Sequence, residues 1–537
     1  MTQAGRVHRE THIPDTQYQK GEEQVANTIA ELLDGHDGGT VAIGAPDREV
    51  LTYAALRTLS ASVGTQLHDA GIGRGDRVAI VLPNGPEMAT CFVTVAQWAV
   101  TAPLNPSYRE DEFSFYLDDL NAKSIVLPAE YEGPALDAAQ KLGLTVLRLA
   151  VQGDAPAGQF TLTAEGGAAG AGKVDTAPPA TDDVALILHT SGTTSRPKIV
   201  PLTHRNVAAS AGHIATSLAL TGTDRCLNVM PLFHIHGLVA AVSASLSVGA
   251  SIWCAPGFDA LKFFGWMRDA SPTWYTAVPT MHQALLSRAG RNRDAIAAAP
   301  LRFVRSSSAS LPGPVMESLA ETFGVPVIEG YGMTEAAHQM CSNPLAPGTQ
   351  KPGSVGLPAG PEVRIADETE NRLIEGTGEV VISGPNVTPG YESNPEANEK
   401  NFFMAEDKRW FRTGDQGAFD ADGYLQLTGR LKEIINRGGE KVSPLEVDGV
   451  LSAHEAVAQC VTFALPHPKL GEDVAVAVVL KESAEADERA LRDFLSARLA
   501  AFKVPRKVLI LDEIPKGATG KLQRIGLAEK LGLQDAG

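Results

Sequence analysis

The chain has 537 residues and a net charge of −17, so it is long enough for two or three domains and unsuited to a nucleic-acid-binding surface. No apolar run reaches the ~20 residues that cross a bilayer, and five scattered cysteines without a C-x-x-C pair predict neither a disulfide framework nor a structural zinc site. The polar N-terminus lacks the apolar core of a signal peptide and the C-terminus lacks the S-K-L address, so we expect a cytoplasmic protein that binds neither nucleic acid nor membranes.

The first part of the chain alternates short β-branched runs with helical patterns. Strands are expected at residues 78–82 and 124–128, and helices at 88–99 and 110–120. An Ala-, Gly- and Thr-rich stretch at 151–183 is typical of a surface loop. Strand, loop and helix in repeated succession predict a layered α/β domain.

The alternation continues to about residue 345 and then changes. Residues 353–429 contain short strands between Gly, Pro and Asp turns, as in a small β-rich subdomain, and residues 433–537 have the pattern of a compact α+β tail. The further strands expected are 184–188, 199–202, 251–254, 273–277, 301–305, 325–328, 457–464 and 474–480, and the further helices are 206–219, 238–248 and 488–500.

A row of small hydroxyl residues lies between the strands expected at 184–188 and 199–202. Small side chains leave backbone N–H groups uncovered and a trailing lysine adds charge, so the segment can wrap a phosphate chain, although its spacing is not that of a Walker P-loop. Alone, such a composition is more often an ordinary loop. The residues concerned are Thr190, Ser191, Gly192, Thr193, Thr194 and Lys198.

The segment EGYGMTEA, at 329–336, combines an aromatic ring, a glycine bend, a hydroxyl and a carboxylate after an expected strand. Tyr331 can stack on a purine ring, and Glu335 can hold a Mg²⁺ ion that bridges phosphates. In isolation, a glutamate after a turn is usually a solvated carboxylate. Glu329, Gly330 and Thr334 are further candidates for nucleotide contacts in this segment.

Three later motifs complete the set. Asp415, between glycines, can accept hydrogen bonds from ribose hydroxyls, and Arg430 can grip the same sugar or a phosphate. The Gly438–Gly439 pair, followed by Lys441, suits the close approach of an extended thiol arm. Lys521, on the glycine-rich loop PKGATGKLQR, can reach a developing carboxylate–phosphate transition state, though a lone lysine is more often a surface residue.

These five motifs, in this order, resemble the adenylate-forming superfamily of acyl-CoA synthetases, luciferases and peptide-synthetase adenylation domains, and within it the AMP-forming acid–CoA ligases. The resemblance implies an α/β fold with a large N-terminal domain of layered α/β subdomains plus a β-rich subdomain (1–431), and a small mobile α+β C-terminal domain (432–537) hinged near Lys432. It implies ATP, Mg²⁺ and coenzyme A as co-substrates and cofactor. It also assigns catalysis to Thr190, Glu335 and Lys521, and an ATP contact to Ser308.

The reaction implied has two halves. The acid's carboxylate attacks the α-phosphorus of ATP to give acyl-AMP and pyrophosphate, and the CoA thiol then displaces AMP. Between the halves the C-terminal domain rotates, withdrawing Lys521 and presenting the Gly438–Gly439 segment. No obligatory protein partner is implied.

The residues expected near the acid are unusually polar. Ser307 and Ser308 stand in RSSSASLPG where small apolar residues are usual, His338 follows the Glu335 motif, and PLFHIHG has His236 besides the frequent His234. Such groups favour a small polar diacid, and the combination is similar to oxalate–CoA ligases. Arg305 is either a cation for the acid or a structural ion-pair partner, and His236 is either a ligand or a core residue.

Other readings stay open. A medium-chain fatty or aryl acid–CoA ligase would share the motifs, and so would an adenylating enzyme that loads a carrier protein. Amino-acid activation is disfavoured because PLFHIHG lacks an aspartate for the substrate ammonium. A His-x-His metal site is disfavoured because no third ligand is evident nearby.

Overall fold

Two large β-sheets form the body of the molecule. The computed structural model describes residues 26–165, 174–190, 197–515 and 522–533. The seven-stranded sheet is parallel except for its outermost strands, β7 and β9. Its order is β7 (Thr161–Ala164), β6 (Thr145–Ala150), β5 (Ser124–Pro128), β3 (Arg77–Ile80), β4 (Val100–Pro103), β8 (Val184–Thr190) and β9 (Lys198–Thr203).

The nine-stranded sheet carries a run of six parallel strands flanked by antiparallel edge strands. Its order is β16 (Leu357–Pro358), β15 (His338–Ser342), β14 (Val327–Met333), β13 (Phe303–Ser307), β12 (Trp274–Ala277), β10 (Arg225–Asn228), β11 (Ser251–Cys254), β1 (Val41–Gly44) and β2 (Leu51–Thr52). Near-continuous apolar runs form these strands because helices cover both faces of a parallel sheet.

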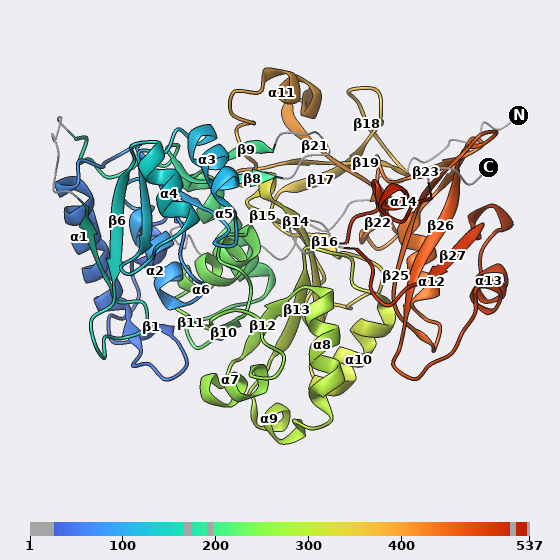
Figure 1. Ribbon diagram of the computed structural model, residues 1–537, viewed down its shortest axis with the longest axis horizontal. Helices are drawn as coiled ribbons and strands as arrows, with labels where there is room; N and C mark the ends of the chain where they lie inside the picture. The colour runs from blue at the N-terminus through green and yellow to red at the C-terminus, as the bar shows by residue number, and fades with distance from the viewer. Residues whose placement is uncertain (1–25, 166–173, 191–196, 516–521, 534–537) are drawn as a thin grey trace, which may run out of the picture.

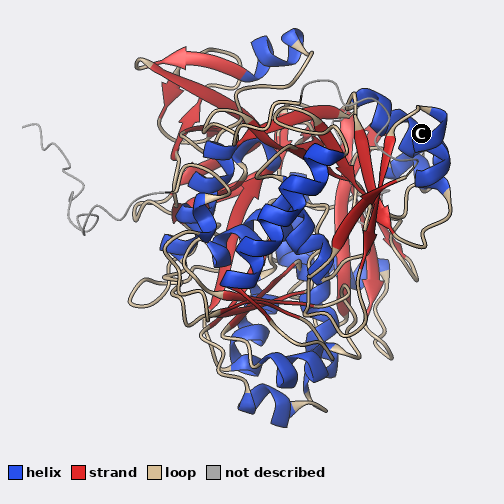
Figure 2. Cartoon of the chain, turned by 90° about the vertical axis from the view of Figure 1, so that its left-hand side faces the viewer, coloured by secondary structure: helices blue, strands red, loops and turns tan. Residues whose placement is uncertain are grey.

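A layer of helices fills the space between the two sheets, and further helices cover their outer faces (Figures 1 and 2). The inner layer contains α1 (Tyr53–Asp69), α2 (Pro86–Val95) and α5 (His204–Ser217), each of which contacts strands of both sheets. The outer helices are α3 (Glu110–Asp119) and α4 (Pro134–Lys141) on one sheet, and α7 (Phe263–Ala270), α8 (Pro279–Ala289), α9 (Arg293–Ala298) and α10 (Gly313–Phe323) on the other. The layered α/β prediction is confirmed.

Two segments differ in detail from what the sequence predicted. The helix expected at 238–248 is a π-helix, η2 (His236–Ser243), continued by the short α6 (Ala244–Leu246), and all of it is buried. A segment that is apolar all round suits this inner layer, and Gly237 fits because a Cβ there would lie 2.5 Å from the Pro231 carbonyl oxygen. The loop expected at 151–183 contains β7, which pairs with β6 at the sheet edge.

A separate six-stranded sheet forms the predicted β-rich subdomain, drawn in yellow to orange at the top of Figure 1. It packs around the buried Val381 and Trp410. Its elements are β17 (Glu362–Ala366), β18 (Leu373–Ile374), β19 (Gly378–Ser383), β20 (Phe402–Ala405), β21 (Lys408–Phe419) and β22 (Leu425–Arg430), with α11 (Pro395–Asn401) at one edge.

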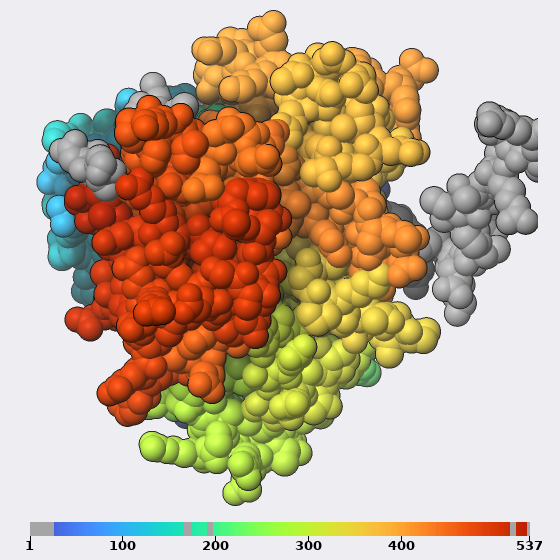
Figure 3. Space-filling model, turned by 90° about the vertical axis from the view of Figure 1, so that its right-hand side faces the viewer, coloured from blue at the N-terminus to red at the C-terminus, as the bar shows by residue number. Residues whose placement is uncertain are grey.

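A C-terminal module with its own five-stranded sheet lies against the larger domain, as Figure 3 shows in orange to red. Two apolar clusters, one on each face of the sheet, form its core. Its elements are β23 (Ile435–Arg437), β24 (Glu440–Val442), α12 (Pro444–Leu451), β25 (Val457–His467), β26 (Gly471–Leu480), α13 (Glu488–Ser496), η4 (Ala501–Lys503), β27 (Lys507–Ile510) and α14 (Leu527–Lys530). No helix in the described part of the chain is both long and apolar enough to cross a membrane.

Candidate active site

The two described ends of the expected phosphate-binding segment lie on the antiparallel β8–β9 hairpin. Thr190 and Lys198 are cross-strand partners that close this hairpin. Ser191, Gly192, Thr193 and Thr194 lie outside the described residues. The hairpin therefore holds Thr190 and Lys198, the two ends of the segment, side by side.

Lys198 and Glu335 meet at Tyr391, a residue that the sequence analysis did not single out. The Lys198 Nζ lies 4.2 Å from the centre of the Tyr391 ring, and the Tyr391 hydroxyl donates a 2.8 Å hydrogen bond to Glu335 Oε1. Burial raises the pKa of Glu335, partly offset by Tyr391 and Lys198, and burial lowers the pKa of Lys198. The only sequence signal for this contact is an aromatic residue after the turn TPG, 56 positions from its partner.

A magnesium ion would find a single carboxylate here. No cluster of three or more His, Cys, Asp or Glu side chains with metal-binding geometry exists among the described residues, so the His-x-His alternative gains no support. One protein carboxylate is enough for Mg²⁺, which is commonly held by one or two carboxylates together with substrate phosphates and water. The buried Glu335, in the short helix η3 (Thr334–Ala336) with Thr334, fits this donor set.

The expected ribose-binding group joins two subdomains. Tyr331, at the end of β14, donates a 2.5 Å hydrogen bond to Asp415 Oδ2 on β21. Asp415 is the cross-strand partner of Arg430, whose Nε lies 3.4 Å from Asp415 Oδ1. Burial raises the pKa of Asp415, and the Asp415 charge in turn raises the pKa of Arg430. The structure therefore brings together Tyr331, Asp415 and Arg430, three of the residues expected to contact the nucleotide, and that contact stays a prediction.

Glu329 has a different environment from its neighbours on β14. It aligns with Ser306 on the neighbouring strand, while Gly330 aligns with Ser307 and lies on the opposite face of the sheet. Glu329 Oε1 accepts a 2.9 Å hydrogen bond from the Leu311 N–H, and burial raises the Glu329 pKa to about 8. Its side chain thus fastens the loop after β13, and a nucleotide contact by Glu329 stays a prediction.

Most side chains expected near the acid form one buried polar cluster where parallel strands of the large sheet end, the usual place for ligands in such sheets. His236 opens η2 after β10, Arg305 and Ser308 come from the end of β13, and His338 begins β15. The His236 and His338 rings lie 5.1 Å apart, centre to centre. His236 Nδ1 is 3.0 Å from Ser308 Oγ, and its Nε2 is 3.4 Å from Arg305 Nη1.

The sequence analysis missed two members of the cluster, Thr276 and Gln339. Thr276 Oγ1 lies 2.6 Å from His236 Nε2 and 3.5 Å from Arg305 Nη1, and Gln339 Oε1 lies 3.4 Å from Arg305 Nη2. Arginine can only donate, so its contact makes His236 Nε2 an acceptor and puts the ring proton on Nδ1, directed at Ser308. The Ser308 hydroxyl proton then remains available for another acceptor.

Ser307 and His234 are the other two residues expected near the acid. The Ser307 hydroxyl donates a 2.7 Å hydrogen bond to the Gly330 carbonyl, so its proton is used within the sheet. A Cβ at Gly330 would lie 2.8 Å from Arg305 Nη2, so the glycine makes room for the guanidinium group. His234 is half-buried before η2 and packs on Phe233. Their contact with the acid stays a prediction.

Comparison with known proteins decides the family. The model of the AMP-binding enzyme family matches residues 34–392, and the model of the AMP-binding enzyme C-terminal domain matches residues 446–521. The chain belongs to the AMP-binding enzyme family. This AMP-binding enzyme is an AMP-forming acid–CoA ligase, and such ligases use ATP, Mg²⁺ and coenzyme A.

Relatives of the AMP-binding enzyme cover nearly its whole length. It is 46% identical to the probable CoA ligase CCL9 of Humulus lupulus, with 89% of this chain and 91% of the relative covered. It is 44% identical to an oxalate–CoA ligase of Arabidopsis thaliana, with 93% and 98% covered. The crystal structure of ATP-bound MatB from Rhodopseudomonas palustris is 29% identical, covers 95% of this chain and 99% of its own, and superimposes with a TM-score of 0.83.

In the C-terminal module of the AMP-binding enzyme, Gly438 and Gly439 form the turn of the β23–β24 hairpin with positive φ angles of 62° and 98°. Lys441 makes a 2.6 Å ion pair with Glu368 of the β-rich subdomain. Lys521 lies outside the described residues, and Lys432 is near enough to Lys198 to lower the pKa of that lysine.

Arg524, three positions after Lys521, anchors this part of the AMP-binding enzyme. Its Nη1 lies 2.6 Å from Asp448 Oδ2, and its Nε lies 3.4 Å from Glu433 Oε2. Glu433 directly follows the expected hinge residue Lys432. Arg524 therefore links Asp448 of this module to the residue that follows the expected hinge.

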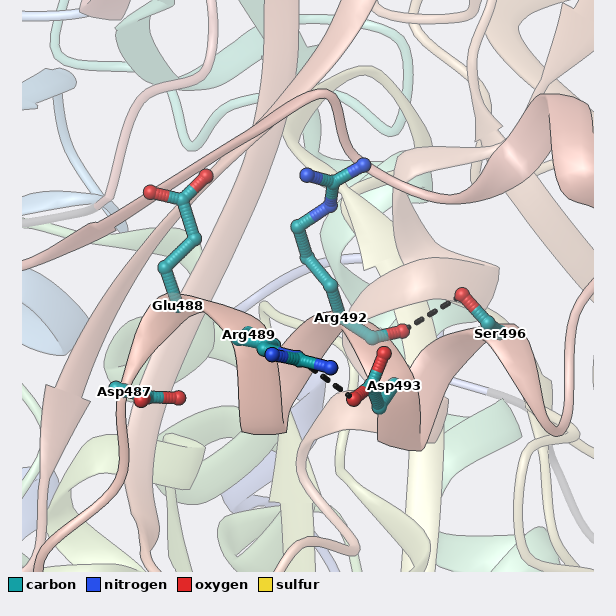
Figure 4. Close-up of a pocket in the computed structure, with 6 residues that line it drawn as sticks. All are labelled: Asp487, Glu488, Arg489, Arg492, Asp493 and Ser496. Atoms are coloured by element: carbon teal, nitrogen blue, oxygen red, sulfur yellow. Dashed lines mark hydrogen bonds and ion pairs between the residues drawn. The ribbon is translucent and has the colours of Figure 1, made fainter.

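Two hollows lie on the surface of the C-terminal module. The first lies on α13 (Figure 4), where Arg489 pairs with Asp493 at 3.8 Å and Ser496 Oγ donates to the Arg492 carbonyl. Its charges are solvated and of both signs, so it indicates no ligand. The second borders the β23–β24 hairpin. Its lining includes Arg492, Arg506, His467 and an ion pair of 2.6 Å between Arg437 and Asp473.

Proposed function

We propose that this acid–CoA ligase activates oxalate, forming oxalyl-AMP and then oxalyl-CoA. The observation that carries the proposal is Arg305. Its side chain is fully buried, and no ion pair joins it to a carboxylate within the described residues. Its Nε has no hydrogen-bond partner there either, and its other contacts are long ones to neutral groups.

A buried cation without a counter-ion is costly, and a bound anion would relieve that cost. In the ligase reaction one carboxylate of the acid is consumed at the α-phosphorus of ATP, so it cannot serve as a permanent partner of Arg305. A second carboxylate on the same acid can remain bound to Arg305 throughout the reaction. The substrate supported best is therefore a diacid whose far carboxylate binds Arg305 and the Ser308 hydroxyl.

The size of the diacid is inferred from the side chains around Arg305. His236, His338 and Gln339 are buried beside it and leave a long chain little room. Oxalate, the shortest diacid, is also the substrate named for the Arabidopsis thaliana relative at 44% identity. A medium-chain fatty or aryl acid would place apolar surface against these polar groups.

For the first half-reaction, we assign Thr190, Ser191, Gly192, Thr193, Thr194 and Lys198 to the phosphates of ATP. We assign Tyr331, Asp415 and Arg430 to its ribose and base. Glu335 would hold Mg²⁺, which neutralises charge on the phosphates when bound. Tyr391 keeps the Glu335 carboxylate directed at this site. Lys521 is assigned to the charge that develops on the carboxylate and α-phosphate.

For the second half-reaction, we assign Gly438 and Gly439 to the thiol arm of CoA. The basic hollow beside that hairpin offers positive charge for the phosphates of the CoA nucleotide. This step requires rotation of residues 432–537 about Lys432, and the Lys441–Glu368 ion pair must open when the rotation occurs. The cytoplasmic location expected from the sequence is part of the proposal.

The test is ATP- and CoA-dependent AMP formation with oxalate, malonate, glycolate, acetate, octanoate and coumarate. Oxalate should give the highest kcat/KM. Preference for octanoate or coumarate would refute the diacid assignment, and AMP release that needs a carrier protein instead of CoA would refute the ligase assignment of the second half-reaction.

Arg305→Met provides the matched variant. Loss of a charge-assisted hydrogen bond is worth about 1.5–3 kcal/mol, so kcat/KM for oxalate should fall about ten- to a hundredfold. The value for glycolate, which has no second carboxylate, should change little. Replacement of a buried charge by an apolar side chain of similar volume is well tolerated, so the variant should fold.

A further inference from the structure

Hydrogen bonds from its amide nitrogen hold the Gln339 side chain in one orientation. Its Nε2 donates to Ser217 Oγ at 2.8 Å and to the Ala359 carbonyl at 3.1 Å, which uses both N–H bonds. The amide oxygen must then point the other way, toward Arg305 Nη2 at 3.4 Å. The side chain is fully buried, so neither amide atom can turn to water instead.

The backbone of Gln339 is also fixed. Its N–H donates to Ser210 Oγ of α5 at 3.4 Å, and its carbonyl accepts from Asn386 Nδ2 at 3.0 Å. Gln339 therefore presents a neutral oxygen to the guanidinium group from a rigid position on β15. A carboxylate at the same place would be an ion-pair partner for Arg305, and glutamate differs from glutamine by only one group.

We infer that Gln339 sets the preference for a second carboxylate, because its neutral amide orients Arg305 without cancelling the arginine's charge. The inference rests on the proposed function. Thr276 and His236 also orient Arg305 without cancelling its charge, since each provides a neutral hydrogen-bond acceptor. The cation is thus held in place by hydrogen bonds, while its charge remains for the ligand. Gln339 is a specificity-determining residue that acts through Arg305.

Gln339→Glu tests the inference with little change in shape. The neighbouring guanidinium favours the ionised carboxyl, which would pair with Arg305 and repel an incoming dianion. KM for oxalate should rise by about a hundredfold, the upper range for loss of one charge-assisted contact. KM for ATP and for glycolate should change less than about threefold, and the oxalate-to-glycolate ratio of kcat/KM should collapse.

Gln339→Met is the matched control. It keeps the length of the side chain and leaves the Arg305 charge uncancelled, so the oxalate preference should persist even if kcat falls. If the two variants lose activity equally for every acid, Gln339 has a merely structural role and the inference is overturned. A Gln339→Glu enzyme that keeps the wild-type oxalate-to-glycolate ratio would overturn it too.

The wild-type panel separates this inference from the proposed function. If another diacid such as malonate is preferred over oxalate, the oxalate proposal fails, and the same two variants test Gln339 with that diacid against its monoacid analogue. If the wild type prefers monocarboxylates, both ideas fail, because no second-carboxylate preference exists for Gln339 to set. If oxalate is preferred and only Gln339→Glu loses that preference, both are supported.

Discussion

Replacement of Glu329 by glutamine should make the stability of the protein less dependent on pH. The Glu329 side chain is only 3% exposed, and burial raises its pKa from 4.5 to about 8. Between these values the unfolded chain carries an ionised carboxylate while the folded protein keeps the proton. The stability that Glu329 contributes is therefore fully present below pH 4.5 and is lost as the pH rises through the folded-state pKa.

The expected size follows from the same values. Each pH unit in this interval changes the free energy of unfolding by about 1.4 kcal/mol, so wild type should lose about 3 kcal/mol relative to Glu329→Gln from pH 5 to pH 7. Glutamine can still accept the Leu311 N–H through its amide oxygen, so the loop after β13 should stay in place.

Urea unfolding curves of wild type and Glu329→Gln should be recorded at several pH values by tryptophan fluorescence, to which the buried Trp274 and Trp410 contribute. Glu321→Gln, at an exposed position on α10, is the control and should run parallel to wild type. If the curves of Glu329→Gln and wild type are parallel from pH 5 to pH 8, Glu329 is ionised in the folded protein and the reasoning from burial is refuted.

Tyr391→Phe should lower the rate of acid-dependent ATP–pyrophosphate exchange about tenfold through loss of the hydrogen bond to Glu335, with thioester formation from supplied acyl-AMP unchanged; equal loss in both assays would contradict that role. Lys521→Ala should cripple the same exchange and spare thioester formation from acyl-AMP, and equal loss of both steps would show that the lysine does not serve the first half-reaction alone. Burial lowers the pKa of His282 to about 4, so stability should fall as the pH drops from 6.5 toward 4, and His282→Gln should flatten that fall in thermal melts.

The sequence predicted what depends on local patterns. Hydrophobic periodicity placed β5 and β11 at their observed residues, and the motif residues lie at strand ends and turns, where side chains converge on a site. Family resemblance assigned Tyr331 and Asp415 to the same nucleotide, and the structure adds a direct hydrogen bond between them across 84 positions.

The polar cluster was predicted less completely because its geometry depends on where β13 ends. The expected end at residue 305 left the two serines in a loop, while the strand runs to Ser307 and binds that hydroxyl to β14. Thr276 and Gln339 carry no motif, and they meet Arg305 only through sheet packing across 29 and 34 positions. Periodicity identifies a buried strand but does not identify its partners.

β14 contacts both the polar cluster proposed to bind the acid and the group expected to hold the nucleotide. The Arg305 guanidinium group packs against the Cα of Gly330, and the Gly330 carbonyl accepts a hydrogen bond from Ser307. The next residue, Tyr331, donates a hydrogen bond to Asp415. A change that shifts this strand to admit a larger acid would also displace the group expected to hold the nucleotide. Acid range is therefore best altered from the η2 side, at His236, because η2 is not a strand of this sheet while His338 pairs directly with Met333 of β14.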